Sequence, residues 1–135
     1  MVIDTSALTA VLLGEPEAEG LAEAIAADPR RLLSAVSALE TGIVIEARKG
    51  EQGGRELDLL LHRIGAQVVA LDERQAGVAR AAWRRFGKGR HPAALNIGDC
   101  CAYALAHLSA EPLLFKGGDF SETDLPAVEY GGRQR

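Results

Sequence analysis

The sequence predicts an α/β fold in which helices flank a central, largely parallel sheet. Two observations lead to this fold class. Short apolar runs alternate along the chain with longer segments whose apolar residues recur at helical spacing. No composition shift or internal repeat divides the chain. Strands that alternate with helices are typical of parallel sheets, because each helix carries the chain back to the start of the next strand.

The composition is that of one globular domain. The chain has 135 residues and a formal net charge of −4, whereas nucleic-acid-binding proteins are usually basic, so any such role must rest on a local basic patch. No apolar run is long enough to span a bilayer, and Asp4 interrupts the first one, so we expect no membrane segment and no signal peptide. Cys100 and Cys101 are adjacent, which indicates core residues of a reduced, cytoplasmic protein rather than a disulfide.

Strand and helix signals alternate through the first half of the chain. Residues 1–3 form a short apolar strand, followed by a helix with Thr5 or Ser6 as its N-cap. A second helix is expected near 17–27, and a strand at 31–34 leads into a third helix that ends at Gly50. The apolar stripe of the third helix comprises Val36, Leu39, Ile43 and Ala47. A Gly-Gly pair separates it from a fourth helix, whose stripe comprises Leu57, Leu60, Leu61 and Ile64.

The second half repeats the alternation. We expect strands at 67–71 and 112–115, helices at 73–86 and 97–108, and a loop between the two helices. A last short strand is expected near 127–129, and residues 131–135 form a flexible tail.

Four acidic residues stand apart because each follows a strand or lies early in the next helix: Asp4, Glu40, Asp99 and Asp119. Each has an ordinary structural alternative, as a helix cap, as a polar residue beside an apolar stripe, or as a turn residue. In a parallel sheet, however, these positions converge on the edge formed by the carboxyl ends of the strands. Converging carboxylates repel one another unless a cation lies among them, and an all-oxygen ligand set selects Mg²⁺ or Mn²⁺. Such an ion activates water, which indicates hydrolysis of a phosphodiester.

The chain resembles the PIN-domain ribonucleases, and most closely the VapC toxins of bacterial type II toxin–antitoxin pairs. Four short stretches in the matching order carry the resemblance over almost the whole chain: 2–8, 34–40, 96–100 and 113–120. The resemblance implies a three-layer PIN-like nuclease domain at 1–130, with a sheet of about five parallel strands. It also implies Mg²⁺-dependent cleavage of RNA, with Mn²⁺ as a substitute, inhibition by a VapB-type antitoxin, and a homodimer.

By the same resemblance, the family's catalytic and metal-binding acids fall on Asp4, Glu40, Asp99 and Asp119. The family's hydroxyl at the metal site falls on Ser6 or, as a second choice, on Thr5.

The last of the four stretches departs from the family pattern. Many members carry two acids there, as Thr-x-Asp-x-Asp-Phe, whereas this chain reads Phe-Lys-Gly-Gly-Asp-Phe from position 115. Gly117 takes the place of the first acid, which leaves Asp119 and, as a distant substitute, Asp124. The departure predicts weaker metal binding, or one ion where two are often drawn.

Basic residues cluster just before the helix that carries Asp99: Arg84, Arg85, Lys88, Arg90 and His91. Such a run is either a solvated surface or, beside a phosphodiesterase site, a path for RNA phosphates. Lys116, at the end of a strand, is a further candidate RNA contact. His91 has no His or Cys partner at ligand spacing, so we do not expect it to bind metal. With one Trp, two Tyr and three Phe in the chain, base stacking is not expected to be the main source of affinity.

Two other functions remain open at this point. A receiver-like signalling domain would use Asp72 as phospho-acceptor and Lys116 as its conserved lysine, but it needs two acids after the first strand and leaves Glu40 unexplained. A catalytically weakened interaction module with the PIN fold is the second alternative, favoured by Gly117. The apolar residues Leu57, Leu60 and Leu61 either face the core or serve a dimer or antitoxin interface.

Overall fold

Short apolar segments build the central sheet. The computed structural model describes residues 1–131, and in this part of the chain four strands form one sheet: β1 (Val2–Ile3), β2 (Leu32–Ser34), β3 (Gln67–Val69) and β4 (Leu113–Leu114). Their order is β3-β2-β1-β4, and every neighbouring pair runs parallel. Val2 pairs with Leu32 on one side and with Leu113 on the other, which puts β1 inside the sheet. The predicted α/β fold with a parallel sheet is confirmed.

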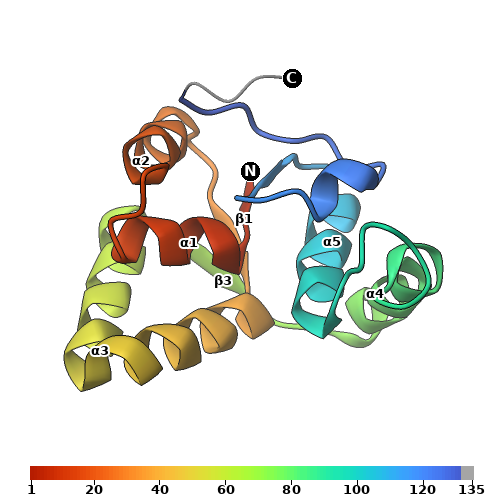
Figure 1. Ribbon diagram of the computed structural model, residues 1–135, viewed down its shortest axis with the longest axis horizontal. Helices are drawn as coiled ribbons and strands as arrows, with labels where there is room; N and C mark the ends of the chain where they lie inside the picture. The colour runs from red at the N-terminus through yellow and green to blue at the C-terminus, as the bar shows by residue number, and fades with distance from the viewer. Residues whose placement is uncertain (132–135) are drawn as a thin grey trace.

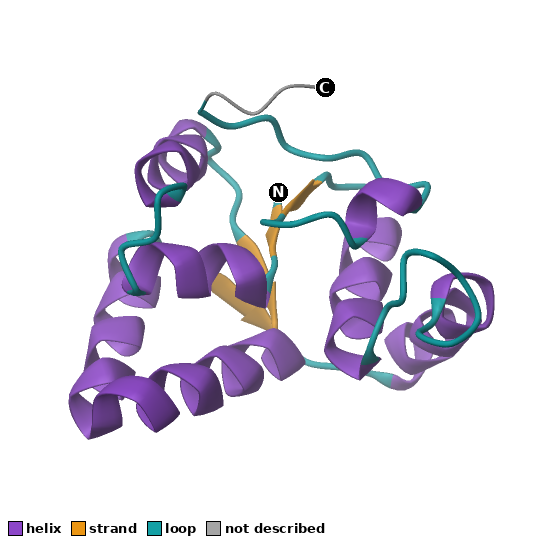
Figure 2. Cartoon of the chain, viewed as in Figure 1, coloured by secondary structure: helices purple, strands orange, loops and turns teal. Residues whose placement is uncertain are grey.

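Helices cover both faces of the sheet. In the described part of the chain they are α1 (Thr5–Leu12), α2 (Ala18–Ala27), α3 (Ala35–Arg63), α4 (Glu73–Phe86), α5 (Ile97–Ser109) and the short 3-10 helix η1 (Phe120–Glu122). The first three lie on one side of the strands, and α4 and α5 lie on the other (Figure 1). Figure 2 shows the resulting three layers, with the strands between the two groups of helices.

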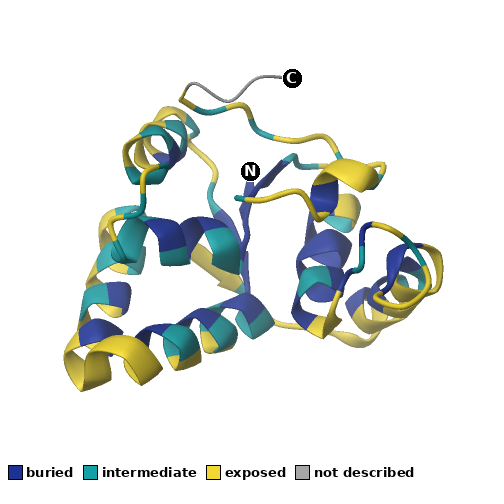
Figure 3. Cartoon of the chain, in the orientation of Figure 1, coloured by how far each residue is buried: buried dark blue, intermediate teal, exposed yellow. Residues whose placement is uncertain are grey.

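Each face of the sheet has its own core. Successive residues of a strand point to opposite faces, and here both faces are apolar. Val2 and Leu32 belong to a cluster with residues of α4 and α5, whereas Ile3 and Leu33 belong to a cluster with residues of α1 and α2. Strands β1, β2 and β4 are therefore buried on both sides, whereas the edge strand β3 is largely exposed (Figure 3).

The expected fifth strand is reduced to a single bridge. Ala127 pairs with Leu113 in parallel, and the Leu113 carbonyl accepts from the Val128 amide at 3.0 Å. The chain therefore runs beside β4 where a fifth strand was predicted, but Pro126 has no amide hydrogen with which to extend a ladder. Of the predicted tail, Gly131 is exposed and lies against Gly20 of α2, and residues 132–135 lie outside the described part of the chain.

The long helix α3 consists of two arms that meet at Gly50. This residue has φ 67° and ψ −163°, which breaks the helical path where the sequence predicted a helix end. The Gly53-Gly54 pair was expected to separate two helices, and this was wrong, since both glycines are helical and buried. They let the arms approach closely, because a Cβ on Gly53 would lie 2.7 Å from the Ile45 side chain.

The first arm of α3 buries a different face from the one predicted. Leu39 is 65% exposed and Ile43 is 62% exposed, although both belong to the predicted apolar stripe. Ser37 and Thr41 are buried instead, facing α1. Thr41 is satisfied inside this packed layer because its hydroxyl donates to the Ser37 carbonyl at 2.7 Å, whereas the buried Ser37 hydroxyl has no hydrogen-bond partner among the described residues. The larger apolar side chains remain on the outer surface.

On the second arm the core interpretation holds. Leu57 is buried, while Leu60, Leu61 and Ile64 pack against the cluster that contains α1 and α2. Cys100 and Cys101 are free and buried, as predicted. None of the helices in residues 1–131 is long and apolar enough to cross a membrane.

Candidate active site at the carboxyl edge of the sheet

Asp4 lies at the end of β1 and is only 5% exposed. It is the N-cap of α1, a role that the sequence reading gave to Thr5 or Ser6. Its Oδ2 accepts from the Ser6 amide at 3.0 Å and from the Ser6 hydroxyl at 2.6 Å. Burial raises the pKa of Asp4, the Ser6 hydrogen bonds oppose this shift, and the charge of Glu40 adds to it.

Ser6 links the ends of the neighbouring strands β1 and β4 at the site. Its hydroxyl donates to Asp4 after β1 and accepts from the Lys116 amide, just after β4, at 2.9 Å. Thr5 points elsewhere, because its hydroxyl donates to the Ser37 carbonyl of α3 at 3.2 Å. Of the two predicted hydroxyls, Ser6 is therefore the one beside the carboxylate.

Glu40 reaches the site from the first arm of α3. Its carboxylate lies directly against the backbone of Gly98, since a Cβ on Gly98 would be 2.6 Å from Glu40 Oε1. This contact brings the start of α3 and the start of α5 together at one edge of the sheet. Glu40 was expected inside a buried stripe, but it lies on the border between that arm's exposed apolar face and the site.

Asp99 lies in the first turn of α5 and takes part in a reciprocal cap. The Asn96 side chain accepts from the Asp99 amide at 2.9 Å, and Asp99 Oδ2 accepts from the Asn96 amide at 3.0 Å. Partial burial raises the pKa of Asp99 to about 6, and the charges of Asp4, Asp119 and Glu40 contribute to this shift. The charges of the other three predicted acids are thus close enough to Asp99 to disfavour its ionisation.

Asp119 completes this group from the loop after β4. It is exposed and precedes η1 without capping it through its side chain. The substitute considered in the sequence, Asp124, lies elsewhere: it accepts from the Tyr103 hydroxyl at 2.7 Å and pairs with Arg85 at 3.4 Å. Of these two, Asp119 is the residue whose charge acts on Asp99.

The four carboxylates lack a protein counter-ion. Among residues 1–131, no Lys or Arg forms an ion pair with Asp4, Glu40, Asp99 or Asp119. In the same part of the chain, no three Asp, Glu, His or Cys side chains are close enough to form a ready-made metal site. The donor chemistry and the uncompensated charge nevertheless fit a divalent cation.

The predicted basic residues are divided between two places. Lys116 does not point at the acids, because its ammonium donates to Glu15 and lies 3.5 Å from Glu17, in the turn between α1 and α2. Arg84, Arg85, Lys88 and Arg90 are exposed at the end of α4 and in the loop that follows. His91 Nδ1 accepts from the Ala93 amide at 3.0 Å, which orders this loop.

Two residues at the site were missed in the sequence. Asn96 was detectable, because Asn-x-x-Asp is a capping-box pattern. Gly98 gave no such signal, since its role is the close approach of Glu40 from a distant helix.

The sheet order contradicts a receiver-like domain. Asp72 follows β3 at one edge of the sheet, whereas Lys116 follows β4 at the other edge of the strand order. The two residues that would act together in a receiver are therefore separated by the sheet. Asp72 serves as the N-cap of α4, accepting from the Gln75 amide at 2.8 Å.

Comparisons with known proteins agree with this architecture. A family model described as PIN domain matches residues 1–125. Ribonuclease VapC of Mycolicibacterium smegmatis is 62% identical over 128 residues, which cover 95% of this chain and 99% of the relative.

Two solved structures share the fold. Mycobacterium tuberculosis VapC20, described as a toxin that cleaves the sarcin–ricin loop, has a TM-score of 0.77 at 17% identity, covering 94% of this chain and 97% of that chain. VapBC2 of Rickettsia felis, bound to a promoter DNA fragment, has a TM-score of 0.75 at 14% identity, covering 96% of this chain and 98% of that chain. Since the family model spans nearly the whole chain and the mycobacterial relative is so similar, the chain belongs to the PIN-domain family, within its VapC group.

Proposed function

We propose that this protein is a Mg²⁺-dependent endoribonuclease that hydrolyses RNA phosphodiester bonds at the carboxylate cluster. The convergence of four acids without a basic partner among residues 1–131 carries this proposal. The 62% identical relative is named a ribonuclease, which supports the same reaction here. Mn²⁺ is expected to substitute for Mg²⁺, because both prefer carboxylate oxygens.

Asp4 and Asp99 are the residues that would hold the ion. Both sit at ends of rigid elements, so little conformational entropy is lost when they bind. Ser6 fixes the orientation of the Asp4 carboxylate through two hydrogen bonds to Oδ2, so this group is already positioned before it would hold the ion. When bound, Mg²⁺ activates water and neutralises charge on the phosphoryl oxygens.

Glu40 orients and deprotonates the attacking water. Its carboxylate lies against Gly98, one residue before Asp99, so it reaches the reacting group from α3. Asp119 would assist as a further ligand from a loop position, and its exposure makes it a weaker ligand than Asp4 and Asp99.

Cleavage of a single-stranded RNA labelled at one end tests this function. We expect fragments with Mg²⁺ and intact RNA with EDTA. Asp4→Asn should slow cleavage about 10²–10⁴-fold, the range typical of lost catalytic groups. Asp58→Asn, at an exposed acid on the second arm of α3, makes the same charge change and should cleave normally.

Thermal unfolding gives an independent measure of the metal site. Binding to the folded state alone adds about 2.7 kcal/mol at 100 times the dissociation constant. Mg²⁺ should therefore raise the melting temperature of the wild type and of Asp58→Asn, but much less that of Asp4→Asn. Cleavage that persists in EDTA, or in Asp4→Asn at the wild-type rate, would refute the metal-site assignment.

We also propose a VapB-type antitoxin as partner, together with a homodimer. A solved structure described as a toxin–antitoxin complex from Klebsiella pneumoniae shares this fold, with a TM-score of 0.70 at 18% identity, and supports the first. The exposed apolar face of α3 supports a docking surface, since Leu39 and Ile43 border a groove of about 570 Å³ between the two arms. Leu60 and Leu61, considered for this role in the sequence, pack against the core instead.

A further inference from the structure

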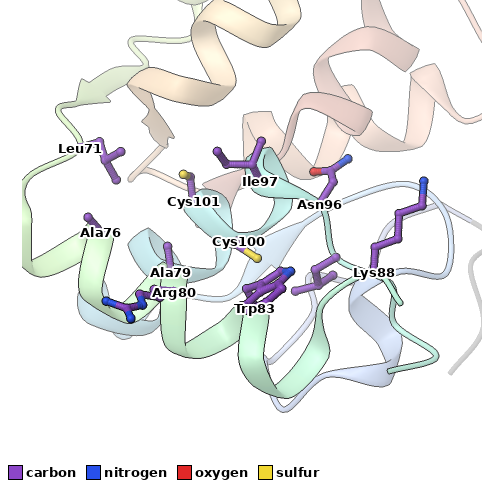
Figure 4. A pocket seen from close by; sticks show the side chains of 11 residues that line it. Leu71, Ala76, Ala79, Arg80, Trp83, Lys88, Asn96, Ile97, Cys100 and Cys101 are labelled. Carbon is purple, nitrogen blue, oxygen red and sulfur yellow. The ribbon is translucent and has the colours of Figure 1, made fainter. Parts of the chain in front are cut away.

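A second hollow lies between α4 and the start of α5. It has a volume of about 470 Å³, within the range of small-ligand sites, and its walls are mostly apolar. Leu71, Trp83 and Ile97 contribute large apolar side chains that are 39%, 44% and 83% exposed. In Figure 4 these side chains surround the hollow, with Cys100 and Cys101 along its α5 side. An apolar hollow of this size is complementary to a molecule with a flat or apolar surface.

The hollow adjoins the carboxylate cluster. Ile97 and Cys100 flank Asp99 on the same helical turn, and both line the hollow. Asn96 also lines the hollow, and its backbone amide donates to Asp99 Oδ2 at 3.0 Å. A molecule in the hollow would therefore lie against the helical turn that carries Asp99.

The charge around the hollow is opposite in sign to that of the acids. Arg80 and Lys88 line it, and no Asp or Glu does. The Arg90 guanidinium lies 4.7 Å from the centre of the Trp83 ring, which holds the indole in place from one side. The whole chain has a net charge of −4, but this hollow has apolar walls and a basic rim. Phosphates on the rim and a base within the walls match it.

We propose that this hollow is a nucleobase subsite, which holds an unpaired RNA base next to the scissile phosphate, against Trp83 and Ile97. The proposal rests on the ribonuclease function and adds to it, because it names the residues that select the base beside the cut. Single-stranded RNA is recognised by splayed bases that pack on aromatic side chains, so one such site adds to the affinity that phosphate contacts supply. A second copy of the chain would cover the apolar walls equally well, but the adjacent acids and the basic rim favour RNA.

Trp83 makes the test direct, because it is the only tryptophan in the chain. Its fluorescence is titrated in EDTA with a short single-stranded RNA and with the same strand carrying abasic nucleotides. We expect the intact RNA to quench the fluorescence saturably, and the abasic strand to bind about 5- to 100-fold more weakly with little quenching. Equal quenching by both strands would overturn the proposal, because phosphate contacts alone would then explain it.

A variant that fills the hollow provides the second arm. Ala76 is an exposed lining residue of α4, so Ala76→Phe blocks the hollow without burying new surface in the core. Ile97→Ser removes a wall at a position that is 83% exposed. Both should weaken RNA binding about 5- to 100-fold and change the base preference at the cut, while the melting shift with Mg²⁺ persists. Ala27→Phe, at an exposed alanine of α2, is the matched control and should behave as wild type.

The outcomes separate this proposal from the nuclease function. Cleavage by the wild type without base-dependent quenching would refute the subsite and leave the nuclease intact. Base-dependent quenching without any cleavage would support the subsite and refute the nuclease. If Trp83 fluorescence changes on dilution of the protein alone, and sedimentation shows that Ala76→Phe loses a dimer, the hollow is covered by a second copy and the proposal is wrong.

Discussion

Asp4 combines two tasks that compete for the same carboxylate. As an N-cap it accepts two hydrogen bonds from Ser6, which favour its ionised form. Its burial and the nearby charge of Glu40 oppose ionisation more strongly, so its pKa is raised. A buried acid with a raised pKa beside other acids is typical of functional sites, because structure alone gains nothing from such repulsion.

The titration of Asp99 predicts how stability depends on pH. Its pKa in the metal-free folded protein is about 6, against 3.8 for an unperturbed Asp. The folded state therefore binds a proton more tightly than the unfolded chain, and this contribution is complete below about pH 4 and lost as the pH rises through about 6. We expect the free energy of unfolding, measured with urea in EDTA, to decrease over this interval.

In Asp99→Asn, the free energy of unfolding should not show the decrease that the titration of Asp99 causes. Mg²⁺ should remove the same decrease from the wild type, because it favours the ionised carboxylate. A smaller decrease should remain in the variant, because the pKa of Asp4 is also raised. Identical pH profiles for the variant and the wild type would show that Asp99 is not the titrating group.

Gly98 tests the role of Glu40. An alanine at this position would put its Cβ 2.6 Å from Glu40 Oε1, and the carboxylate, at the end of a flexible side chain, would move away. We expect Gly98→Ala to slow cleavage at least about tenfold. The free energy of unfolding should stay the same or rise by up to about 1 kcal/mol, since alanine favours helix.

A shorter acid provides the control for this variant. Glu40→Asp in the Gly98→Ala background should restore part of the cleavage rate, because the shorter side chain avoids the added methyl group. If Gly98→Ala cleaves RNA as fast as the wild type, the position of Glu40 against α5 has no catalytic role.

At the level of elements, α3 does the most to shape the molecule. Its first arm brings Glu40 to the site, and its second arm covers the sheet with Leu60 and Leu61. The break at Gly50 lets one continuous segment do both. The outer side of the first arm is left apolar and exposed, which indicates a surface that meets another chain.

Gly50 should be more important to stability than other exposed glycines. Its φ of 67° and ψ of −163° belong to a region that is open essentially to glycine alone. Gly50→Ala should therefore lower the free energy of unfolding by about 1–3 kcal/mol. Gly77→Ala is the control: this glycine lies within α4, a Cβ there would meet nothing within 4 Å, and alanine should stabilise by about 0.5–1 kcal/mol. Equal changes in the free energy of unfolding for the two substitutions would mean that the backbone conformation at Gly50 does not require glycine.

The exposed face of α3 predicts where the antitoxin binds. Leu39→Ser with Ile43→Ser should change the free energy of unfolding by less than about 0.5 kcal/mol per site, because both side chains are mostly exposed. The same pair should weaken binding of the cognate VapB-type antitoxin at least about tenfold by calorimetry. Leu59→Ser with Val68→Ser, at positions 48% and 50% exposed, is the matched control. Undiminished antitoxin binding by the α3 variant would exclude this face.

Across the whole molecule, charge is distributed unevenly. The net charge is −4, yet the end of α4 and its following loop carry Arg84, Lys88 and Arg90 on the surface. Under the proposed function the acids at the sheet edge would repel RNA, so attraction of the strand would depend on these basic residues and on the proposed cation.

This distribution predicts the salt dependence of RNA binding. In EDTA, Arg84→Ala with Lys88→Ala should reduce the slope of log affinity against log salt by about 1.4, since each contact to a single strand contributes about 0.7. Arg48→Ala with Arg55→Ala, on α3 away from the site, removes the same charge and should leave the slope nearly unchanged. Anisotropy of a labelled RNA provides the measurement. If both double variants have equal slopes, the basic residues at the end of α4 are a solvated surface and do not contact RNA phosphates.

The sequence by itself determined the fold class and the place of the acids. Strand and helix periodicities are local, so Val2 and Leu113 were recognisable as parts of buried strands without knowledge of their partners. In a parallel sheet the ends of such strands lie at one edge, which predicted that Asp4, after β1, and Asp119, after β4, lie on the same side of the molecule. Asp99 follows a loop after α4 and not a strand, so its place beside them depends on the packing of α5.

Only the tertiary structure decided what each helix face meets. Periodicity finds the apolar stripe of Leu39 and Ile43. It cannot show that the hydroxyl residues of the same arm are the ones buried against α1, so that the stripe faces outward. In the same way, Lys116 turns to Glu15 and Gly98 admits Glu40 because of contacts between segments far apart in the chain. Such contacts depend on distances and shapes that arise after folding, so no local pattern of residues specifies them.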